Sequence, residues 1–153
     1  FIVSLIGSIA MWWVYFHLGV EAGAKQITHS EESGRFARIA YTYLHLPIVL
    51  GIVVSAVGDE VLLAHPQGHM DAKAMLSIIG GPLLFLLGTV LFKHVIRGIY
   101  QLSHLVGMAL LLVLFPMAPS LTPLALAALV ALVLVVVGAW EAASLGGADR
   151  AEA

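Results

Sequence analysis

Residues 121–145 read LTPLALAALVALVLVVVGAWEAASL, an apolar run long enough to decide the fold. An α-helix needs about 20 apolar residues to cross a hydrocarbon core of about 30 Å. The part from Val130 to Val137 has the β-branched residues typical of strands. The run is too long for a strand of a membrane barrel, however, and it lacks the alternation of one. It therefore predicts a transmembrane helix, because backbone groups in lipid must form hydrogen bonds within their own segment.

Four similar runs precede this one, at residues 1–20, 36–63, 74–95 and 99–117, with polar or Pro/Gly-containing breaks between them. Each is close to the length that spans a bilayer as a helix. The predicted fold class is therefore all-α, a polytopic transmembrane helix bundle of about five spans. This bundle would occupy residues 1–145 and leave residues 146–153 as a short cytoplasmic tail.

The composition supports a membrane location. Of the 153 residues, 61% are hydrophobic and only 10% are charged, whereas a soluble domain usually carries about 25% charged residues. The net charge of -2 offers no basic surface for nucleic acid. The absence of cysteine excludes a disulfide framework, a thiolate metal site and a cysteine nucleophile within this sequence. The expected partner is therefore the lipid bilayer, and no nucleic acid.

Basic residues in the loops predict the orientation of the spans, since cytoplasmic loops carry an excess of Lys and Arg. One side receives Lys25, Arg35, Arg38, Lys93, Arg97 and Arg150. The other side receives Lys73 alone. This difference predicts that the first loop and the C-terminus are cytoplasmic and that Phe1 lies at the outer face of the membrane.

The sequence opens at Phe1 inside an apolar run, without an initiator Met or a basic leader. A signal peptide needs that leader and a small-residue cleavage site. We therefore expect a fragment of a longer protein, whose missing N-terminal spans are partners of this bundle. Association into an oligomer is left open.

The second span carries the most informative polar residues. Arg38, His45 and Asp59 are spaced by multiples of seven, so they fall on roughly one helix face, with Tyr41 beside it. His45 would lie about 13 Å in from Phe36, near the middle of the bilayer. Ionisable groups at that depth are costly and often mark ion or proton paths.

A proline follows this histidine. Pro47 cannot donate its amide and crowds the carbonyl of Tyr43. The sequence therefore predicts a kink near His45. The triplet Gly80-Gly81-Pro82 likewise predicts a break or a packing kink in the third span, and small residues at four-residue spacing, such as Gly51 with Ser55, allow close approach of helices.

The fourth span adds Gln101, His104 and Met108 at helical spacing. Histidine titrates near physiological pH, which suits a proton path. The transport-path candidates are therefore Arg38, Tyr41, His45, Asp59 and His104.

Other interpretations of the histidines stay open. His45 and His104 could fix packing through hydrogen bonds to neighbouring helices. Imidazole also suits haem or a transition metal, but no histidine pair repeats along one span, and neither HExxH nor a carboxylate–histidine motif is present. In the second loop, His65, His69 and Asp71 are explained better by a Pro/Gly loop than by a metal. The prediction is therefore no metal site and no cofactor.

Catalytic motifs are missing from the sequence. There is neither a GxSxG nucleophile elbow nor a GxGxxG nucleotide motif. We assign no catalytic residue and favour a protein that is not an enzyme.

Two runs combine aromatic residues with His, Pro or Gly at fixed offsets. They are MWWVYF at residues 11–16 and RIAYTYLHLPIVLGI at residues 38–52, the second followed by AVG at 56–58 and by Glu60. These runs resemble the low temperature requirement protein A (LtrA) family. That family's usual opening, an acidic residue followed by Phe-Phe-Asp-Leu, is missing, which favours a C-terminal portion of such a protein.

The resemblance implies a bacterial multi-span membrane protein, named for a cold-growth phenotype rather than for a mechanism. Residue 17 is His where the family often has an acidic residue, so no role for a carboxylate is carried over to that position. No other site residue is carried over either.

The leading functional hypothesis is a transporter or permease for a proton, an ion or a small solute in the bacterial cytoplasmic membrane. One alternative is a haem- or metal-dependent membrane redox protein. Another is a non-catalytic membrane scaffold or sensor.

Overall fold

The computed structural model describes residues 1–16, 42–98 and 100–151, with backbone only at residues 97 and 145–151. The helices are α1 (Ile2–Phe16), α4 (His45–Ala64), α5 (Ala72–Arg97), α6 (Leu102–Met117) and α7 (Pro123–Ala151), with a 3-10 turn η2 (Ala118–Ser120) between the last two. No strand occurs in the described ranges. The predicted all-α fold class is confirmed.

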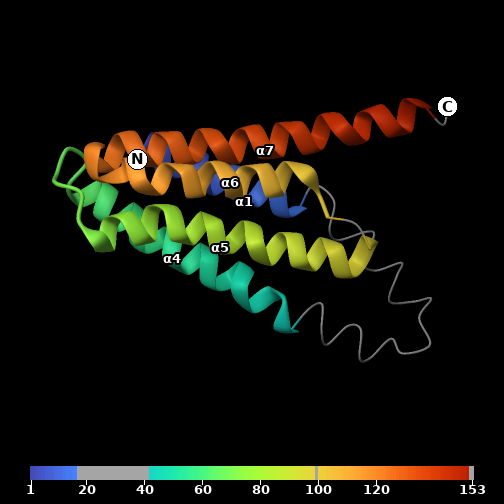
Figure 1. Cartoon of the computed structure of the whole chain (residues 1–153), viewed down its shortest axis with the longest axis horizontal. Coiled ribbons are helices and arrows are strands. Elements are labelled where there is room, and N and C mark those ends of the chain that lie inside the picture. The colour runs from blue at the N-terminus through green and yellow to red at the C-terminus, as the bar shows by residue number, and fades with distance from the viewer. Residues whose placement is uncertain (17–41, 99, 152–153) are drawn as a thin grey trace.

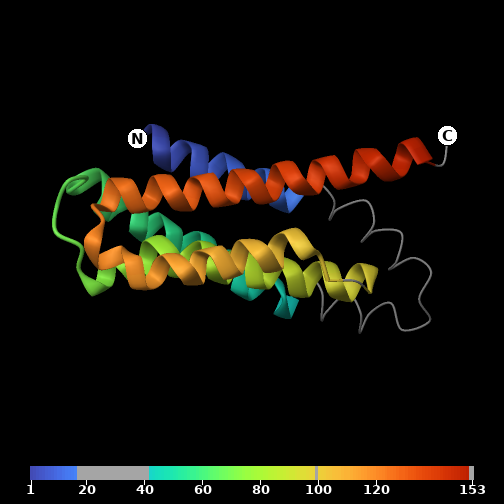
Figure 2. The ribbon, with the colours of Figure 1, turned by 45° about the horizontal axis from the view of Figure 1, so that its top comes forward.

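Four of these helices, α4 to α7, are long and apolar enough to cross a membrane, and α1 is a shorter apolar helix. Their lengths and composition confirm the prediction of a helical membrane bundle. The helices run roughly along one common direction (Figures 1 and 2). The N-terminal end of the bundle holds Phe1, the loop at residues 65–71 and the α6–α7 corner. The C-terminal end of the bundle holds the end of α1, the start of α4, the α5–α6 corner and the end of α7.

Helix α5 is central, because it packs against α4, α6 and α7. Its side chains Ile79, Phe85 and Leu86 are fully buried. Helix α1 packs chiefly against α7, and α4 packs chiefly against α5. Figure 2 shows α1 beside α7, with α4 on the other side of the bundle next to α5.

Glycines bring the backbones of α4 and α5 into contact. A Cβ added to Gly51 would lie 2.5 Å from the backbone nitrogen of Phe85, and one added to Gly81 would lie 2.5 Å from the backbone nitrogen of Ser55. Real Cβ atoms cannot approach backbone so closely, so these positions require glycine. In lipid, where apolar side chains gain little by leaving the solvent, such close backbone packing stabilises helix association.

Of the two outcomes predicted for Gly80-Gly81-Pro82, the break does not occur, whereas the packing kink stays a prediction. Helix α5 continues through all three residues. Neighbouring helices can compensate for the amide that proline lacks. The glycine at position 81 serves the contact with α4, whereas a Cβ on Gly80 would meet nothing within 4 Å.

Local signals in the sequence set the helix ends. Asp71 caps α5, since its Oδ1 accepts a hydrogen bond from the amide of Ala74 at 2.7 Å. Gly98 ends α5 in the left-handed conformation with a φ of 72°. Helix α7 begins at Pro123, which lacks the amide that would be unbonded there, and Oγ1 of Thr122 accepts from the amide of Ala125 at 3.2 Å.

The predicted start of the second span, at residue 36, lies outside the described residues, and the residues before α4 are described from 42 onward, with π-helical backbone at 42 and 43. The described part of α4 begins at His45, so Pro47 lies in the first helical turn. Amides in the first turn of a helix have no acceptor within it, so proline is tolerated there, and the predicted kink near His45 stays a prediction. The position of His45 relative to Phe36 lies outside the described residues.

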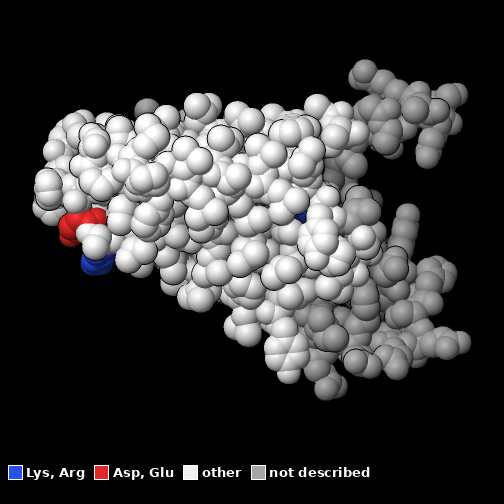
Figure 3. Space-filling view, in the orientation of Figure 1, with Lys and Arg blue, Asp and Glu red and all other residues white. Residues whose placement is uncertain are grey.

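Apolar side chains cover most of the outer surface. On α4, Leu46, Val49, Leu50 and Val53 are exposed. The face drawn in Figure 3 carries almost no charge over its described part, and its charged side chains gather mainly at the N-terminal end. A surface of this kind fits lipid or further apolar helices as its surroundings.

Candidate functional site

Two of the five predicted path residues, Arg38 and Tyr41, lie outside the described residues. The other three are placed in two separate surroundings. His45 and Asp59 face the space between α1 and α4, whereas His104 lies in a cluster of charged side chains among α1, α5, α6 and α7. The structure thus does not join His45 and His104 in one site.

Aromatic side chains hold His45 at the C-terminal end of the bundle. Its Nε2 is 2.7 Å from the hydroxyl oxygen of Tyr15, a hydrogen-bond distance. Its ring meets the ring of Phe92 edge-on, with centroids 5.0 Å apart. These contacts link α1, α4 and α5 and fix the orientation of a half-buried imidazole.

A cavity of about 340 Å³ opens beside this histidine. We call it the His45 cavity. It lies between α1 and α4, and its lining includes Ser8, Met11, Tyr15, His45 and Ile48. Pockets for small ligands have volumes from about 300 Å³ upward, so this cavity is large enough for a small solute as well as for an ion with water.

A second cavity of about 40 Å³ lies nearer the N-terminal end, and we call it the Asp59 cavity. Its polar lining comes from Ser4, Ser8, Ser55 and Asp59. A single water needs about 10–15 Å³ on this measure. The hydroxyl oxygen of Ser4 is buried and has no hydrogen-bond partner within the described part of the chain, so water in this cavity would satisfy it.

The two cavities adjoin. Ser8 and Met11 of α1 line both of them, and Ser55 of α4 bonds to the carbonyl of Gly51 at 2.8 Å with its oxygen 3.8 Å from the sulfur of Met11. We call the two cavities together the α1–α4 groove. It leads from Asp59 toward His45 along one face of α1.

The charged cluster consists of Lys93, His104 and Glu141. Nζ of Lys93 donates to Oε1 of Glu141 at 2.6 Å, and both side chains are only 2% exposed. Nζ also donates to the backbone carbonyl of Val14 at 3.0 Å and lies 3.4 Å from Nε2 of His104. One ammonium group therefore joins α5 to α7, α1 and α6.

His104 is fully buried within this cluster. Its Nδ1 is 3.2 Å from Oγ of Ser103, and its Nε2 is 3.8 Å from Oε2 of Glu141. That carboxylate oxygen has no hydrogen-bond partner among the described residues. A buried oxygen in this state is unusual, because nearly all buried polar atoms are bonded.

Sequence reasoning missed Glu141 and misread Lys93. The predicted orientation treats Lys93 as a loop charge, but this residue lies within α5, buried and ion-paired. Lys93 is therefore no evidence for the side of the membrane on which the α5–α6 corner lies. The available signal was one isolated lysine and one isolated glutamate in two different apolar runs, since ionisable residues inside spans usually pair with one another.

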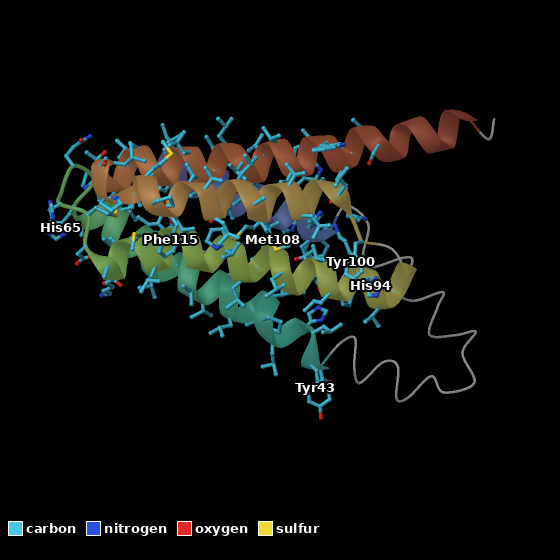
Figure 4. The ribbon with its side chains drawn as sticks, viewed as in Figure 1. Tyr43, His65, His94, Tyr100, Met108 and Phe115 are labelled. Atoms are coloured by element: carbon cyan, nitrogen blue, oxygen red, sulfur yellow. The ribbon has the colours of Figure 1, made fainter. Side chains whose placement is uncertain are left out.

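Other histidines lie at the ends of the bundle. His94 stacks on Tyr100 at the α5–α6 corner, with ring centroids 3.9 Å apart, whereas His65 lies at the N-terminal end (Figure 4). Tyr43 points away from the bundle in the same view. Within the described ranges, no group of three or more His, Cys, Asp or Glu side chains is placed to hold a metal.

Comparison with known proteins places the chain. The family model described as bacterial low temperature requirement A protein (LtrA) matches residues 1–139. This chain belongs to the LtrA family. The LtrA match covers both aromatic runs that suggested the resemblance, but it does not assign the chain to a C-terminal portion, so that part of the expectation stays a prediction.

One curated relative of this LtrA chain is an uncharacterized protein of Rhizobium meliloti (strain 1021). The two are 37% identical over 150 residues, which cover 98% of this chain and 37% of the relative. The chain thus spans little more than a third of that relative. No solved structure matches it significantly.

Proposed function

We propose that this LtrA chain is part of a transporter or permease that carries a proton or a small cation across the bacterial cytoplasmic membrane along the α1–α4 groove. The observation that carries the proposal is the shared lining of the two cavities. His45 and Asp59 lie on the same helix, and Ser8 and Met11 line the cavities beside both of them. Polar groups inside a membrane bundle usually mark such routes.

The chemistry of the groove favours a cation. Asp59 supplies a carboxylate, and Ser4, Ser8 and Ser55 supply hydroxyl oxygens at the same cavity. Among the described lining residues there is no Lys or Arg. Carboxylate and hydroxyl oxygens replace the water of a cation, and an acidic mouth attracts positive charge.

A direction for the groove follows from the charges of the sequence. Arg97 ends α5 and Arg150 lies in the last turn of α7, both at the C-terminal end of the bundle, and Arg35 and Arg38 fall between α1 and α4 in the sequence. We propose that this end is cytoplasmic, as the excess of basic residues favours. Asp59 then lies toward the outer mouth of the groove and His45 toward its inner mouth.

The test uses the full-length protein reconstituted into liposomes. Proton entry is followed with an entrapped pH-sensitive dye under an imposed potassium diffusion potential, and sodium entry is followed with radioactive sodium. The expected result is flux of one of the two above that of protein-free liposomes, reduced in His45→Ala and Asp59→Asn. Equal flux with and without protein for both cations overturns the proposal and favours a scaffold or sensor.

A cysteine placed in the groove locates the route. This sequence has no cysteine, so Ser8→Cys is introduced into a background in which any cysteine elsewhere in the protein is replaced. Modification with a charged methanethiosulfonate is expected to block the flux. The matched control is Ser120→Cys, because Ser120 is exposed in η2 and does not line the groove. Unchanged flux after complete modification of Ser8→Cys places the route elsewhere.

A further inference from the structure

We propose that Glu141 is a proton-binding site whose bound proton lies between its Oε2 and Nε2 of His104, and that proton binding loosens the hold of Lys93 on α1. The inference rests on the proposed transport function and deepens it, since it names the group that couples a proton to the α1–α4 groove.

The hydrogen bonds around Lys93 define the state without the proton. An ammonium group has three N–H donors and no acceptor. Acceptors around it come from three different helices: Oε1 of Glu141 at 2.6 Å, the carbonyl of Val14 at 3.0 Å and Nε2 of His104 at 3.4 Å. Because Nε2 accepts in this arrangement, Nδ1 of the neutral ring carries the hydrogen and donates to Oγ of Ser103 at 3.2 Å.

Oε2 of Glu141 is the open position in this cluster. It is buried and without a hydrogen-bond partner among the described residues, and the side chain is only 2% exposed. The nearest imidazole nitrogen, Nε2 of His104, lies 3.8 Å away. That separation exceeds a direct hydrogen bond, and it can be closed by a small shift of either side chain or bridged by water.

The ligand that fits this position is a proton rather than a metal ion. A metal ion at Oε2 would lie beside the ammonium of Lys93, which is paired to the other oxygen of the same carboxylate, and like charges repel strongly in a buried site. A hydronium ion transfers a proton to the carboxylate of Glu141, so one O–H bond of the hydronium breaks, one O–H bond of the carboxylic acid forms, and water is released. The new O–H of Oε2 can then donate to Nε2 of His104.

The titratable groups that face Glu141 come from two helices. They are Lys93 from α5 and His104 from α6. Helix α1 contributes the carbonyl of Val14 through Lys93, and α7 itself contributes the hydroxyl of Ser144, which donates to the Glu141 backbone carbonyl. On α4, the titratable residue Asp59 lines the Asp59 cavity together with Ala127 and Val130, which belong to the first half of α7, away from Glu141.

Protonation changes the bonding of α1. It replaces the ion pair between Lys93 and Glu141 by a weaker neutral hydrogen bond and competes for Nε2 of His104, so Lys93 is held less firmly. Lys93 in turn bonds to the carbonyl of Val14, and the next residue, Tyr15, bonds to His45 in the groove. The proton on Glu141 thus acts on the wall of the His45 cavity through two consecutive residues of α1.

Infrared difference spectroscopy tests proton binding without any need for transport. Full-length protein is compared at acidic and alkaline pH, and the carbonyl band of a buried carboxylic acid is expected at acidic pH and absent from Glu141→Gln. Should Glu141→Gln fail to fold, Glu141→Asp keeps a carboxyl and is expected to shift the band. A band unchanged in the folded variant overturns the proton site, whatever the flux measurement shows.

Labelling of Ser8→Cys tests the coupling to the groove. The rate with a charged thiol reagent is measured over a pH series and divided by the rate of Ser120→Cys, which corrects for titration of the thiol itself. We expect this ratio to change by about tenfold as Glu141 takes up its proton, within the usual range for coupled sites, and to become independent of pH in Glu141→Gln or, should that variant fail to fold, in Lys93→Met/Glu141→Leu. A ratio with the same pH dependence in the variant overturns the coupling, even where the infrared band is assigned to Glu141.

Discussion

Val14 and Tyr15 are consecutive residues of α1, yet they bond to two different polar groups, one on α5 and one on α4. The carbonyl of Val14 accepts from Lys93 at 3.0 Å, and the hydroxyl of Tyr15 lies 2.7 Å from Nε2 of His45. The C-terminal end of α1 is therefore tied both to the charged cluster and to the α1–α4 groove. Any movement of this end of α1 therefore changes both the charged cluster and the α1–α4 groove.

Removal of the Tyr15 hydroxyl tests the groove side of this link. Tyr15→Phe keeps the ring and its edge contact with His45 but loses the hydrogen bond. We expect a loss of stability of about 0.5–1.5 kcal/mol, the usual net value for such a bond, and a reduced flux, because the imidazole is no longer oriented. Thermal unfolding in detergent and liposome flux measure the two effects.

The matched control for this change is Tyr43→Phe. Tyr43 is 59% exposed and points away from the bundle (Figure 4), so its hydroxyl is expected to matter for neither quantity. Equal flux in Tyr15→Phe and in the unmodified protein would contradict the role given to His45 in the groove.

Two adjacent glycines of α5 should respond in opposite ways to alanine. Gly81→Ala places a methyl group 2.5 Å from the backbone nitrogen of Ser55, so α4 and α5 must separate, at a cost of about 1–3 kcal/mol or more. Gly80→Ala meets nothing within 4 Å and is expected to stabilise the helix by up to about 1 kcal/mol. Unfolding midpoints of the two variants in detergent provide the comparison, and similar values would contradict the backbone contact between α4 and α5.

The helical membrane fold could be predicted from the sequence because span length and apolar composition are local properties. The close approach of α4 and α5 was only partly visible. Gly51 and Ser55 have the spacing of a packing motif, but nothing in the sequence says that Gly81 opposes Ser55 rather than breaking α5. Which faces of two helices meet depends on contacts between residues far apart in the chain.

The candidate site was predicted less completely, for a similar reason. His45, Asp59 and His104 stood out because each is polar within an apolar run. Lys93 seemed to belong to a loop, since it lies near the end of its span, and Glu141 attracted no attention without its partner. A charge pair contributed by two helices is recognisable only when the two helices are seen side by side.

The orientation of the bundle can be tested with two single cysteines. Gln67 is exposed in the loop at the N-terminal end, and Glu31 belongs to the first loop of the sequence, outside the described residues. A membrane-impermeant maleimide applied to intact cells is expected to label Gln67→Cys and to label Glu31→Cys only after permeabilisation, because basic flanks stay cytoplasmic. Labelling of both from the same side would contradict the layout of alternating spans.

Removing one partner of the ion pair between Lys93 and Glu141 should destabilise the protein strongly, whereas replacing both partners by apolar residues should change its stability little. Lys93→Met leaves the carboxylate of Glu141 buried without its counter-charge, and we expect a loss of about 3–5 kcal/mol in unfolding free energy. In Lys93→Met/Glu141→Leu both charges are absent, so stability should return close to that of the unmodified protein, since apolar replacements of a buried pair are often neutral.

Lys73→Met is the control, because Lys73 is exposed at the start of α5. The double variant, folded but without the carboxylate, should also lose the pH dependence of Ser8→Cys labelling. A double variant as unstable as Lys93→Met would mean that the hydrogen bond to Val14, rather than the charge pair, holds this end of the bundle together.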